Sequence, residues 1–335
     1  HRNIVHVACG FNFSYMLDRD GQLYCCGSNS YGQLSYPALF STMAQRASEQ
    51  HIPGWIDRPI DQAYFGGSPV VQVSCGGNFT CVLTQSNKLY YCGQCGQEYI
   101  QEFTLVQHDA FQNQTIRKVT CGGYHTLVLL DNGALYGLNA NMFGSSGTGG
   151  RGINDFAHVA PPCPSGVRDV VSGYNYFMCI GNDGRLYGSS GNDHSVKPGD
   201  GQLGSSVPCA YNCQYVVVLD LPYPVVEIVT GASSTTTFVV LENGDIYGAG
   251  CNEGGGLGLG DKENRLRFVR VLDHRDRRLP GVAIGAGAFH SVLCFYDTVR
   301  DGDWRQNLYR MVSGTRGVVR DGAKQLSDVQ IVCLS

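Results

Sequence analysis

Residues 119–141 read VTCGGYHTLVLLDNGALYGLNAN. An apolar run ends at a pair of glycines, a second apolar run covers residues 126–130, and an Asp-Asn-Gly turn leads into a Leu-Tyr pair at residues 135–136. Short apolar runs joined by glycine-containing turns are typical of antiparallel strands. The stretch therefore predicts a small meander of three strands.

The same pattern occurs six times along the chain. The equivalent turn glycines lie 46 to 66 residues apart, at Gly10, Gly76, Gly122, Gly173, Gly231 and Gly287. A period of about 50 residues with several short strands per unit is typical of propeller blades, whereas helical solenoids need a helix-period pattern that is absent here. The sequence thus predicts an all-β fold, a β-propeller of four-stranded antiparallel blades.

Each unit also carries an apolar pair after a variable loop, such as Leu105-Val106, which we interpret as the fourth, outer strand. We expect one β-propeller domain over residues 1–335. Its repeats are predicted near residues 4–69, 70–117, 118–168, 169–225, 226–280 and 281–326, with a closing or partial strand at 327–335. That last segment resembles the opening strand of a repeat. It is expected either to pair with the first blade and close the ring, or to begin a seventh blade.

The composition excludes several classes of protein. The chain has 45 glycines, 19 tyrosines and only 16% charged residues, which fits many short strands joined by tight turns and argues against disorder. A formal net charge of -4 argues against a polyanion as the main partner, because phosphate binding needs clustered Lys and Arg. No apolar run is long enough for a membrane span, and the first residues lack the apolar segment of a signal peptide. We expect neither a nucleic-acid partner nor a membrane span.

Fifteen cysteines, together with Asn-x-Ser/Thr sequons at Asn12, Asn78 and Asn113, are compatible with a secreted protein held by disulfides. The repeat alignment favours another interpretation. Three copies place cysteine directly before the turn glycine, at Cys9, Cys75 and Cys121, and the others place Ser172, Thr230 and Ala286 there. Such a position selects a small side chain, and a free cysteine packs well as one. We therefore expect reduced cysteines and an intracellular protein, cytoplasmic or cytoskeletal rather than nuclear.

Two segments have some features of ligand sites but lack the rest of the pattern. The glycine-rich loop at residues 143–155 lacks the GxxxxGK[ST] spacing of a phosphate-binding loop, and no helix-forming segment follows it. Cys209 and Cys213 have only His194 as a nearby further ligand, which is too few for a zinc site. The sequence contains no nucleophile elbow, no His-Glu-x-x-His motif and no evident pair of carboxylates flanked by apolar residues. We expect no catalytic residues, cofactor or metal, and hence a protein that is not an enzyme.

The repeat, written out in full, contains Cys-Gly-Gly at residues 121–123, His-Thr at 125–126, Asp-Asn-Gly at 131–133 and Leu-Tyr at 135–136, with Gly-Gln-Leu turns at 32–34 and 201–203. In these motifs the chain resembles a divergent member of the regulator of chromosome condensation repeat family. The resemblance implies seven blades, as six clear repeats plus a partial seventh. The family's usual Trp after the Leu-Tyr pair is replaced, by Cys26, Cys92, Leu138, Ser189 and Ala249. Its histidine survives as His125 and His290, which we expect to be core residues bonded to the backbone of a neighbouring blade.

Members of this family share a fold rather than a function. The resemblance implies a non-enzymatic protein–protein interaction scaffold, which presents propeller loops to a protein partner in a larger intracellular assembly, for example a cytoskeletal or ciliary one. The alternative is a guanine-nucleotide exchange factor or regulator of a small GTPase. Aromatic and arginine side chains dominate binding hot spots. The expected partner-binding residues are therefore those on the inserted loops: Trp55, Arg151, Trp304 and Arg305.

Overall fold

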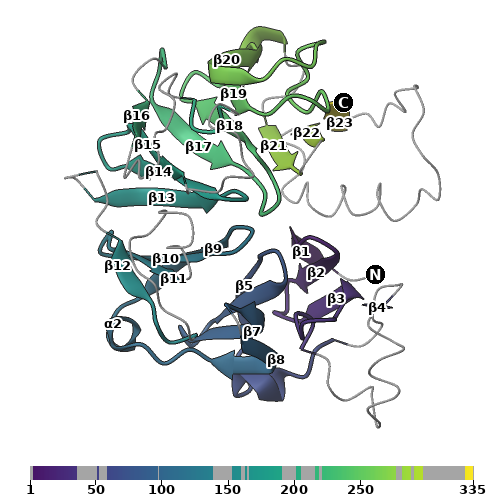
Figure 1. Ribbon diagram of the computed structural model, residues 1–335, viewed down its shortest axis with the longest axis vertical. Coiled ribbons are helices and arrows are strands. Elements are labelled where there is room, and N and C mark those ends of the chain that lie inside the picture. The colour runs from purple at the N-terminus through teal and green to yellow at the C-terminus, as the bar shows by residue number, and fades with distance from the viewer. Residues whose placement is uncertain are drawn as a thin grey trace.

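The strands form six small antiparallel sheets, which Figure 1 shows one after another around a common centre. They belong to a computed structural model that describes residues 3–35, 51–52, 59–96, 98–138, 153–159, 163, 166–190, 201–204, 216–218, 221–276, 281–287, 290–296 and 329–334. We number the sheets blade 1 to blade 6 in chain order.

Five blades have four strands each, in sequence order across the sheet. Blade 1 consists of β1 (Ile4–Cys9), β2 (Phe13–Asp18), β3 (Leu23–Ser28) and β4 (His51–Ile52). Blade 2 consists of β5 (Val70–Cys75), β6 (Phe79–Thr84), β7 (Leu89–Cys95) and β8 (Glu98–Leu105). Blade 3 consists of β9 (Ile116–Cys121), β10 (Thr126–Leu130), β11 (Leu135–Leu138) and β12 (Ala157–Val159).

Blade 4 consists of β13 (Val167–Ser172), β14 (Tyr176–Gly181), β15 (Leu186–Ser190) and β16 (Val216–Val218). Blade 5 consists of β17 (Val225–Val229), β18 (Thr236–Leu241), β19 (Ile246–Gly250) and β20 (Arg265–Leu272). Blade 6 has three strands, β21 (Gly281–Ala286), β22 (Ser291–Tyr296) and β23 (Val329–Leu334). Short helical turns lie in the connections, namely η2 (Gln62–Phe65), α2 (Asp109–Gln112) and η4 (His274–Asp276).

The first strand of each blade is the innermost. Strand β1 contacts β5, and the contacts continue in order through β9, β13, β17 and β21. Because each inner strand touches the inner strand of the next repeat, the blades follow the order of the repeats around the centre. This confirms the predicted all-β propeller of small antiparallel sheets.

The predicted number of blades was wrong for the described part of the chain, which forms six blades rather than seven. Strand β23 was expected to open a seventh repeat or to pair with the first blade. It pairs instead with β22, from Ser291 opposite Leu334 to Tyr296 opposite Val329. The sixth repeat lacks a tight turn directly after β22, since its first Asp-Gly pair comes only at residues 301–302. The edge of β22 is therefore left open to a strand from farther along the chain.

The hairpin turns between the second and third strands depend on left-handed backbone. In four blades this conformation falls on a glycine with φ between 76° and 87°, at Gly21, Gly133, Gly184 and Gly244. Blade 2 uses Asn87, with φ of 59°. Asparagine tolerates this region better than most residues, so the turn survives without glycine.

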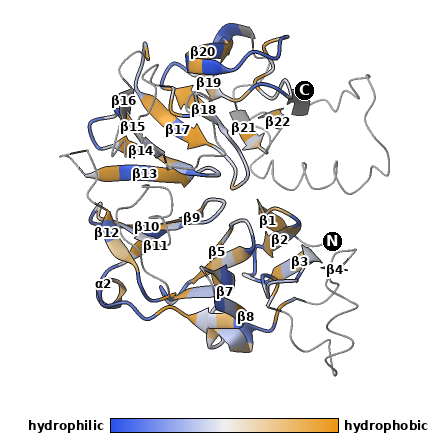
Figure 2. Ribbon diagram, in the orientation of Figure 1, coloured by the Kyte–Doolittle hydropathy of each residue, from blue (hydrophilic) through white to orange (hydrophobic). Residues whose placement is uncertain are grey.

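Apolar side chains fill the spaces between consecutive blades. One buried cluster joins blades 1 and 2 through residues such as Tyr15 and Val73, and similar clusters join each later pair of blades up to 5 and 6. Figure 2 shows that hydrophobic residues concentrate on the strands, while the turns are mostly hydrophilic. The core is thus divided into layers, each of which fixes one blade against the next.

The Gly-Gln-Leu turns are part of this packing. The backbone carbonyl of Gln33 accepts hydrogen bonds from the Tyr15 hydroxyl in blade 1 (3.1 Å) and from the Thr80 hydroxyl in blade 2 (2.9 Å). In the same way the carbonyl of Gln202 accepts from the Thr237 hydroxyl of blade 5 at 2.8 Å. The motif that marks the repeat in the sequence therefore ties neighbouring blades together.

Candidate protein-interaction face

A chain of backbone hydrogen bonds joins the turns that follow the inner strands. The N–H of Phe11 donates to Gly77 (3.1 Å), that of Gly77 to Gly123 (2.9 Å), that of Gly123 to Tyr174 (2.9 Å) and that of Tyr174 to Ser234 (2.9 Å). Each donor lies in one blade and its acceptor in the next. The turns of blades 1 to 5 thus form a continuous belt at one end of the inner strands, which we call the turn belt.

Three aromatic rings gather on the turn belt. The rings of Phe11 and Tyr174 stack with centroids 5.7 Å apart and an interplanar angle of 29°, and Tyr124 meets both rings edge-on at 5.9 Å and 5.5 Å. The hydroxyl groups of Tyr124 and Tyr174 lie 3.2 Å apart, within hydrogen-bonding distance. These rings come from blades 1, 3 and 4, and we refer to them as the aromatic triad.

Glycine makes room for the triad. A Cβ atom on Gly77 would lie 2.8 Å from the ring of Phe11 and 2.4 Å from the carbonyl oxygen of Gly123. A Cβ atom on Gly123 would likewise lie 2.8 Å from the ring of Tyr174. Phe11 and Tyr174 therefore each rest on the backbone of an adjacent blade, where any larger residue would push the ring away.

The triad is accessible as well as ordered. The side chain of Tyr124 is 39% exposed, and Phe11 and Tyr174 are half-buried. Partly exposed aromatic residues on a fixed scaffold offer a large contact area and lose little conformational entropy on binding. This surface is suited to hold the side chains of a protein partner.

The four partner-binding residues predicted from the sequence, Trp55, Arg151, Trp304 and Arg305, lie outside the described residues. Sequence reasoning favoured inserted loops and missed the triad. A signal was present, because the position after the turn glycine is Phe11 and Tyr174 in two repeats but Gly77 and Gly123 in the two between them. A large side chain beside a glycine at the same position of the adjacent repeat indicates a ring that lies across that blade.

His125 is a core residue, but its expected hydrogen bond to a neighbouring blade was a wrong prediction. The side chain is fully buried, and neither ring nitrogen has a hydrogen-bond partner. The equivalent residues of blades 1 and 2 are Phe13 and Phe79, so this position accepts an apolar ring in two neighbouring repeats. Burial lowers the pKa of His125 to about 4, so it is neutral at pH 7 and unsuited to proton transfer. His290 is exposed, against the prediction of a core residue.

The described cysteines are mostly buried thiols. Ten are free thiols, and seven of these are buried. Burial raises the pKa of Cys179 to about 12, with a further contribution from the nearby Cys163, and this suppresses the nucleophilic thiolate. In the shared position before the turn glycine, Cys75 and Cys121 are buried while Cys9 is exposed.

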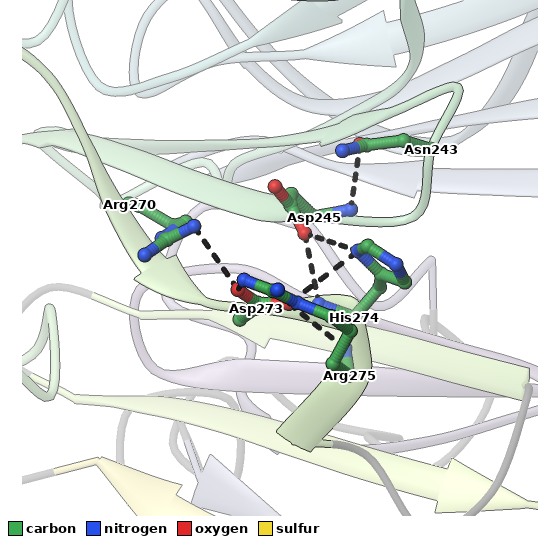
Figure 3. A network of polar contacts seen from close by, with 6 residues as sticks. All are labelled: Asn243, Asp245, Arg270, Asp273, His274 and Arg275. Carbon is green, nitrogen blue, oxygen red and sulfur yellow. Dashed lines mark hydrogen bonds and ion pairs between the residues drawn. The ribbon is translucent and has the colours of Figure 1, made fainter.

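Within the described residues, one group of side chains has the spacing of a metal site. Ligand atoms of Asp245, Asp273 and His274 lie within 4.8 Å of one another. As Figure 3 shows, one ring nitrogen of His274 faces both carboxylates. Its Nδ1 is 2.8 Å from Asp245 Oδ1, and its backbone N–H donates to the same oxygen at 2.8 Å.

Two arginines already neutralise this group. The Asp273 carboxylate accepts from Arg270 at 3.0 Å and from Arg275 at 2.9 Å, and these contacts hold the pKa of Asp273 well below its usual range. Burial would raise the pKa of Asp245, but the hydrogen bonds from His274 outweigh it and lower the pKa. Two guanidinium groups beside the carboxylates disfavour a cation. The network serves instead to fasten the end of β20 to the hairpin before β19.

Comparisons with known proteins show which repeat family and which relatives the chain is similar to. Two family models, each described as regulator of chromosome condensation (RCC1) repeat, match the chain, one at residues 4–33, 70–97 and 116–137 and the other at residues 20–83. Probable E3 ubiquitin-protein ligase HERC4 of Homo sapiens is 28% identical over 217 residues, which are 60% of this chain and 18% of the ligase. The chain thus matches less than a fifth of that relative.

Solved structures share the fold. Human WBSCR16 superposes with a TM-score of 0.69 at 19% identity, covering 86% of this chain and 71% of that one. A chain in the crystal structure of Kap60 bound to yeast RCC1 (Prp20) gives a TM-score of 0.65 at 18% identity, covering 87% of this chain and 67% of that one. In the described part of the chain, no helix has the length and apolar character needed to cross a membrane.

Proposed function

Because this chain is a divergent β-propeller of the regulator of chromosome condensation repeat family, we propose that it is a non-enzymatic protein–protein interaction scaffold. One face of the ring, centred on the aromatic triad, receives a protein partner in a larger intracellular assembly, cytoplasmic or cytoskeletal. Trp55, Arg151, Trp304 and Arg305, on the inserted segments, add contacts to a protein partner. Residues 1–335 act as one propeller domain in this role.

The observation that carries the proposal is the aromatic triad on its turn belt. The belt holds the rings through inter-blade backbone hydrogen bonds of 2.9 to 3.1 Å, so the surface is formed before a partner arrives. A preorganised surface avoids part of the entropy cost of association. Aromatic residues are also the side chains that most often dominate interface energy.

The relatives are compatible with this role. The match to the probable ubiquitin ligase HERC4 covers 18% of that protein, as expected of a module that serves a larger protein rather than of a whole enzyme. Among the described residues, the titratable groups whose pKa is shifted owe the shift to burial, to hydrogen bonds within the fold or to structural ion pairs. His125 and Cys179 are examples of burial, and Asp273 of an ion pair.

The test is affinity purification of the tagged chain from its native source, followed by mass spectrometry. Tyr124→Ala should reduce recovery of the partner at least tenfold, because loss of an aromatic hot spot costs about 2 kcal/mol or more. Tyr223→Ala is the matched control, since Tyr223 is 49% exposed but precedes β17 at the opposite end of the inner strands. Circular dichroism verifies that both variants fold. Equal recovery by both variants would refute the assignment of the triad face.

The second candidate is a guanine-nucleotide exchange factor or regulator of a small GTPase. It is favoured by the family resemblance, which implies this function as the alternative to a scaffold, and the fold is like that of yeast RCC1 (Prp20). Release of a fluorescent nucleotide from a panel of small GTPases separates the two candidates. A scaffold leaves the release rate unchanged, whereas acceleration by the purified chain would establish the exchange activity.

A further inference from the structure

The end of the inner strands away from the turn belt has a different chemistry. A strand of six residues spans about 17–20 Å, so this second mouth lies on the opposite face of the ring. The second residue of the inner strand is Val71 in blade 2, Arg117 in blade 3, Arg168 in blade 4 and Val226 in blade 5. Val71 and Val226 are 52% and 49% exposed. Two arginines thus stand between two exposed valines.

The surface is hollowed at the arginines. A depression of about 410 Å³ is lined by Arg117, Lys118, Leu129, Arg168, Asp169 and Val226. Leu129 is fully buried and forms part of the floor, and the other residues come from the inner strands of three consecutive blades. We call this depression the arginine hollow.

The charges of the arginine hollow are only partly balanced. Lys118 Nζ lies 2.6 Å from Asp169 Oδ1, and an Arg168 amino group donates to the Val225 carbonyl at 2.6 Å. Glu227, next to the hollow, interacts electrostatically with both Lys118 and Asp169. Burial raises the pKa of Glu227, the negative charge of Asp169 raises it further, and Lys118 opposes them.

Arg117 is the third positively charged residue of the arginine hollow. Its side chain is exposed, and within the described residues its guanidinium group has no hydrogen bond or ion pair. Lys118, Arg117 and Arg168 bring three positive charges against the two carboxylates of Asp169 and Glu227. One positive charge is left over, and it sits on a side chain that is free to bind.

We propose that the arginine hollow binds one carboxylate side chain of a protein partner, an acidic residue flanked by apolar residues in an extended segment. Arginine offers paired N–H groups that match a carboxylate. A single excess positive charge balances one carboxylate, whereas a phosphate, with about two negative charges, would be repelled by Asp169 and Glu227. The exposed valines on either side receive the apolar neighbours of the acidic residue. The site is on the face opposite the aromatic triad, so it stands whether or not the triad binds a partner.

The test uses three fluorescein-labelled peptides that differ at one residue, with central sequences Val-Glu-Val, Val-Gln-Val and Val-phosphoserine-Val. Fluorescence anisotropy with the purified chain should give about tenfold tighter binding for the glutamate peptide than for the glutamine peptide, the usual size of a charge-assisted hydrogen bond. Arg117→Gln should remove this difference, and Arg117→Lys should restore part of it. Arg185→Gln is the control, because Arg185 is an exposed arginine in the hairpin of blade 4 that does not line the hollow.

Three results would overturn the proposal. One is a glutamate peptide that fails to bind at millimolar concentration or binds no better than the glutamine peptide. Another is a glutamate preference that persists in Arg117→Gln. The third is tighter binding of the phosphoserine peptide, which would assign the hollow to phosphate. Because the peptides are tested directly, failure here is distinguishable from failure of the triad in affinity purification.

Discussion

Replacing His125 by phenylalanine should stabilise the protein and remove part of its acid sensitivity. The histidine ring is fully buried, and both of its nitrogens lack hydrogen-bond partners. Phe13 and Phe79 occupy the same place beneath the turn glycines of blades 1 and 2, so the space accepts a phenyl ring. The substitution therefore exchanges two unsatisfied polar atoms for carbon at nearly constant shape.

The size of the effect follows from two terms. An unsatisfied buried polar atom costs about 1–3 kcal/mol, so we expect a gain of at least about 1 kcal/mol at pH 7.5 after some loss to imperfect fit. The second term depends on pH. The pKa of His125 is about 4 in the folded state and about 6.5 in an unfolded chain, so the unfolded state binds more protons between these values. Stability of the wild type is therefore greatest above pH 6.5 and falls as the pH decreases towards 4.

Between pH 7.5 and 5.0 this proton uptake lowers the free energy of unfolding of the wild type by about 2 kcal/mol, at 1.36 kcal/mol per pKa unit. His125→Phe has no titrating side chain at this position, so it does not lose this part of its stability. The advantage of the variant should thus grow from about 1 kcal/mol at pH 7.5 to about 3 kcal/mol at pH 5.0. Other titrating groups are common to both proteins, so their contributions cancel in the difference.

The assay is urea unfolding, followed by circular dichroism, at both pH values. His290→Phe is the control, because it changes the equivalent histidine of blade 6, which is exposed. An advantage that is equal at the two pH values would refute the reasoning about proton uptake. A variant less stable than the wild type at pH 7.5 would show that the histidine nitrogens are satisfied.

Three further predictions concern single side chains. Gly77→Ala should lower the free energy of unfolding by about 1–3 kcal/mol in urea unfolding, because the new Cβ atom would lie 2.4 Å from the Gly123 carbonyl oxygen. Gly285→Ala is the control. A Cβ atom there has nothing within 4 Å, so the free energy of unfolding should change by less than about 0.5 kcal/mol. Thr237→Val should cost about 1 kcal/mol in urea unfolding, because it removes the hydroxyl that donates to the Gln202 carbonyl. Asp273→Asn should lower the melting temperature at pH 7, and the two proteins should converge in strong acid. The reason is that stability from a lowered carboxylate pKa is present above the unfolded pKa and is lost as the pH falls through the folded one. A difference in melting temperature between the two proteins that stays constant from pH 7 to pH 2 would contradict this.

The fold was largely predictable from local sequence signals. Turn glycines such as Gly133 occupy left-handed backbone, which few other residues adopt, so they mark the hairpins directly. The blade count was wrong because it depends on the pairing of β23 with β22, and the segment between them gives no local signal for that pairing. Similarly, the repeat motif predicted that His125 is a core residue, but the absence of a hydrogen-bond partner depends on atoms from neighbouring strands.

The candidate site was harder to predict, for a physical reason. Phe11, Tyr124 and Tyr174 meet only because the turns of separate blades converge on one axis. Each residue taken alone resembles an ordinary turn aromatic. The arginine hollow has the same origin, since Arg117 and Arg168 lie side by side only when two inner strands are aligned. Predicting such convergence requires knowing how the strands of separate blades are aligned, and the sequence motifs do not specify this alignment.

The pairing of β23 with β22 sets an order of events for a growing polypeptide. Every blade is made from consecutive strands and can assemble as it leaves the ribosome, but the longest connection between described strands of one blade separates β22 from β23. Blade 6 must wait until a further 32 residues, 297–328, have been translated and β23 has emerged. During that interval the edge of β22 is open to chaperones and to neighbouring nascent chains, so the last blade is the step of biosynthesis most exposed to error.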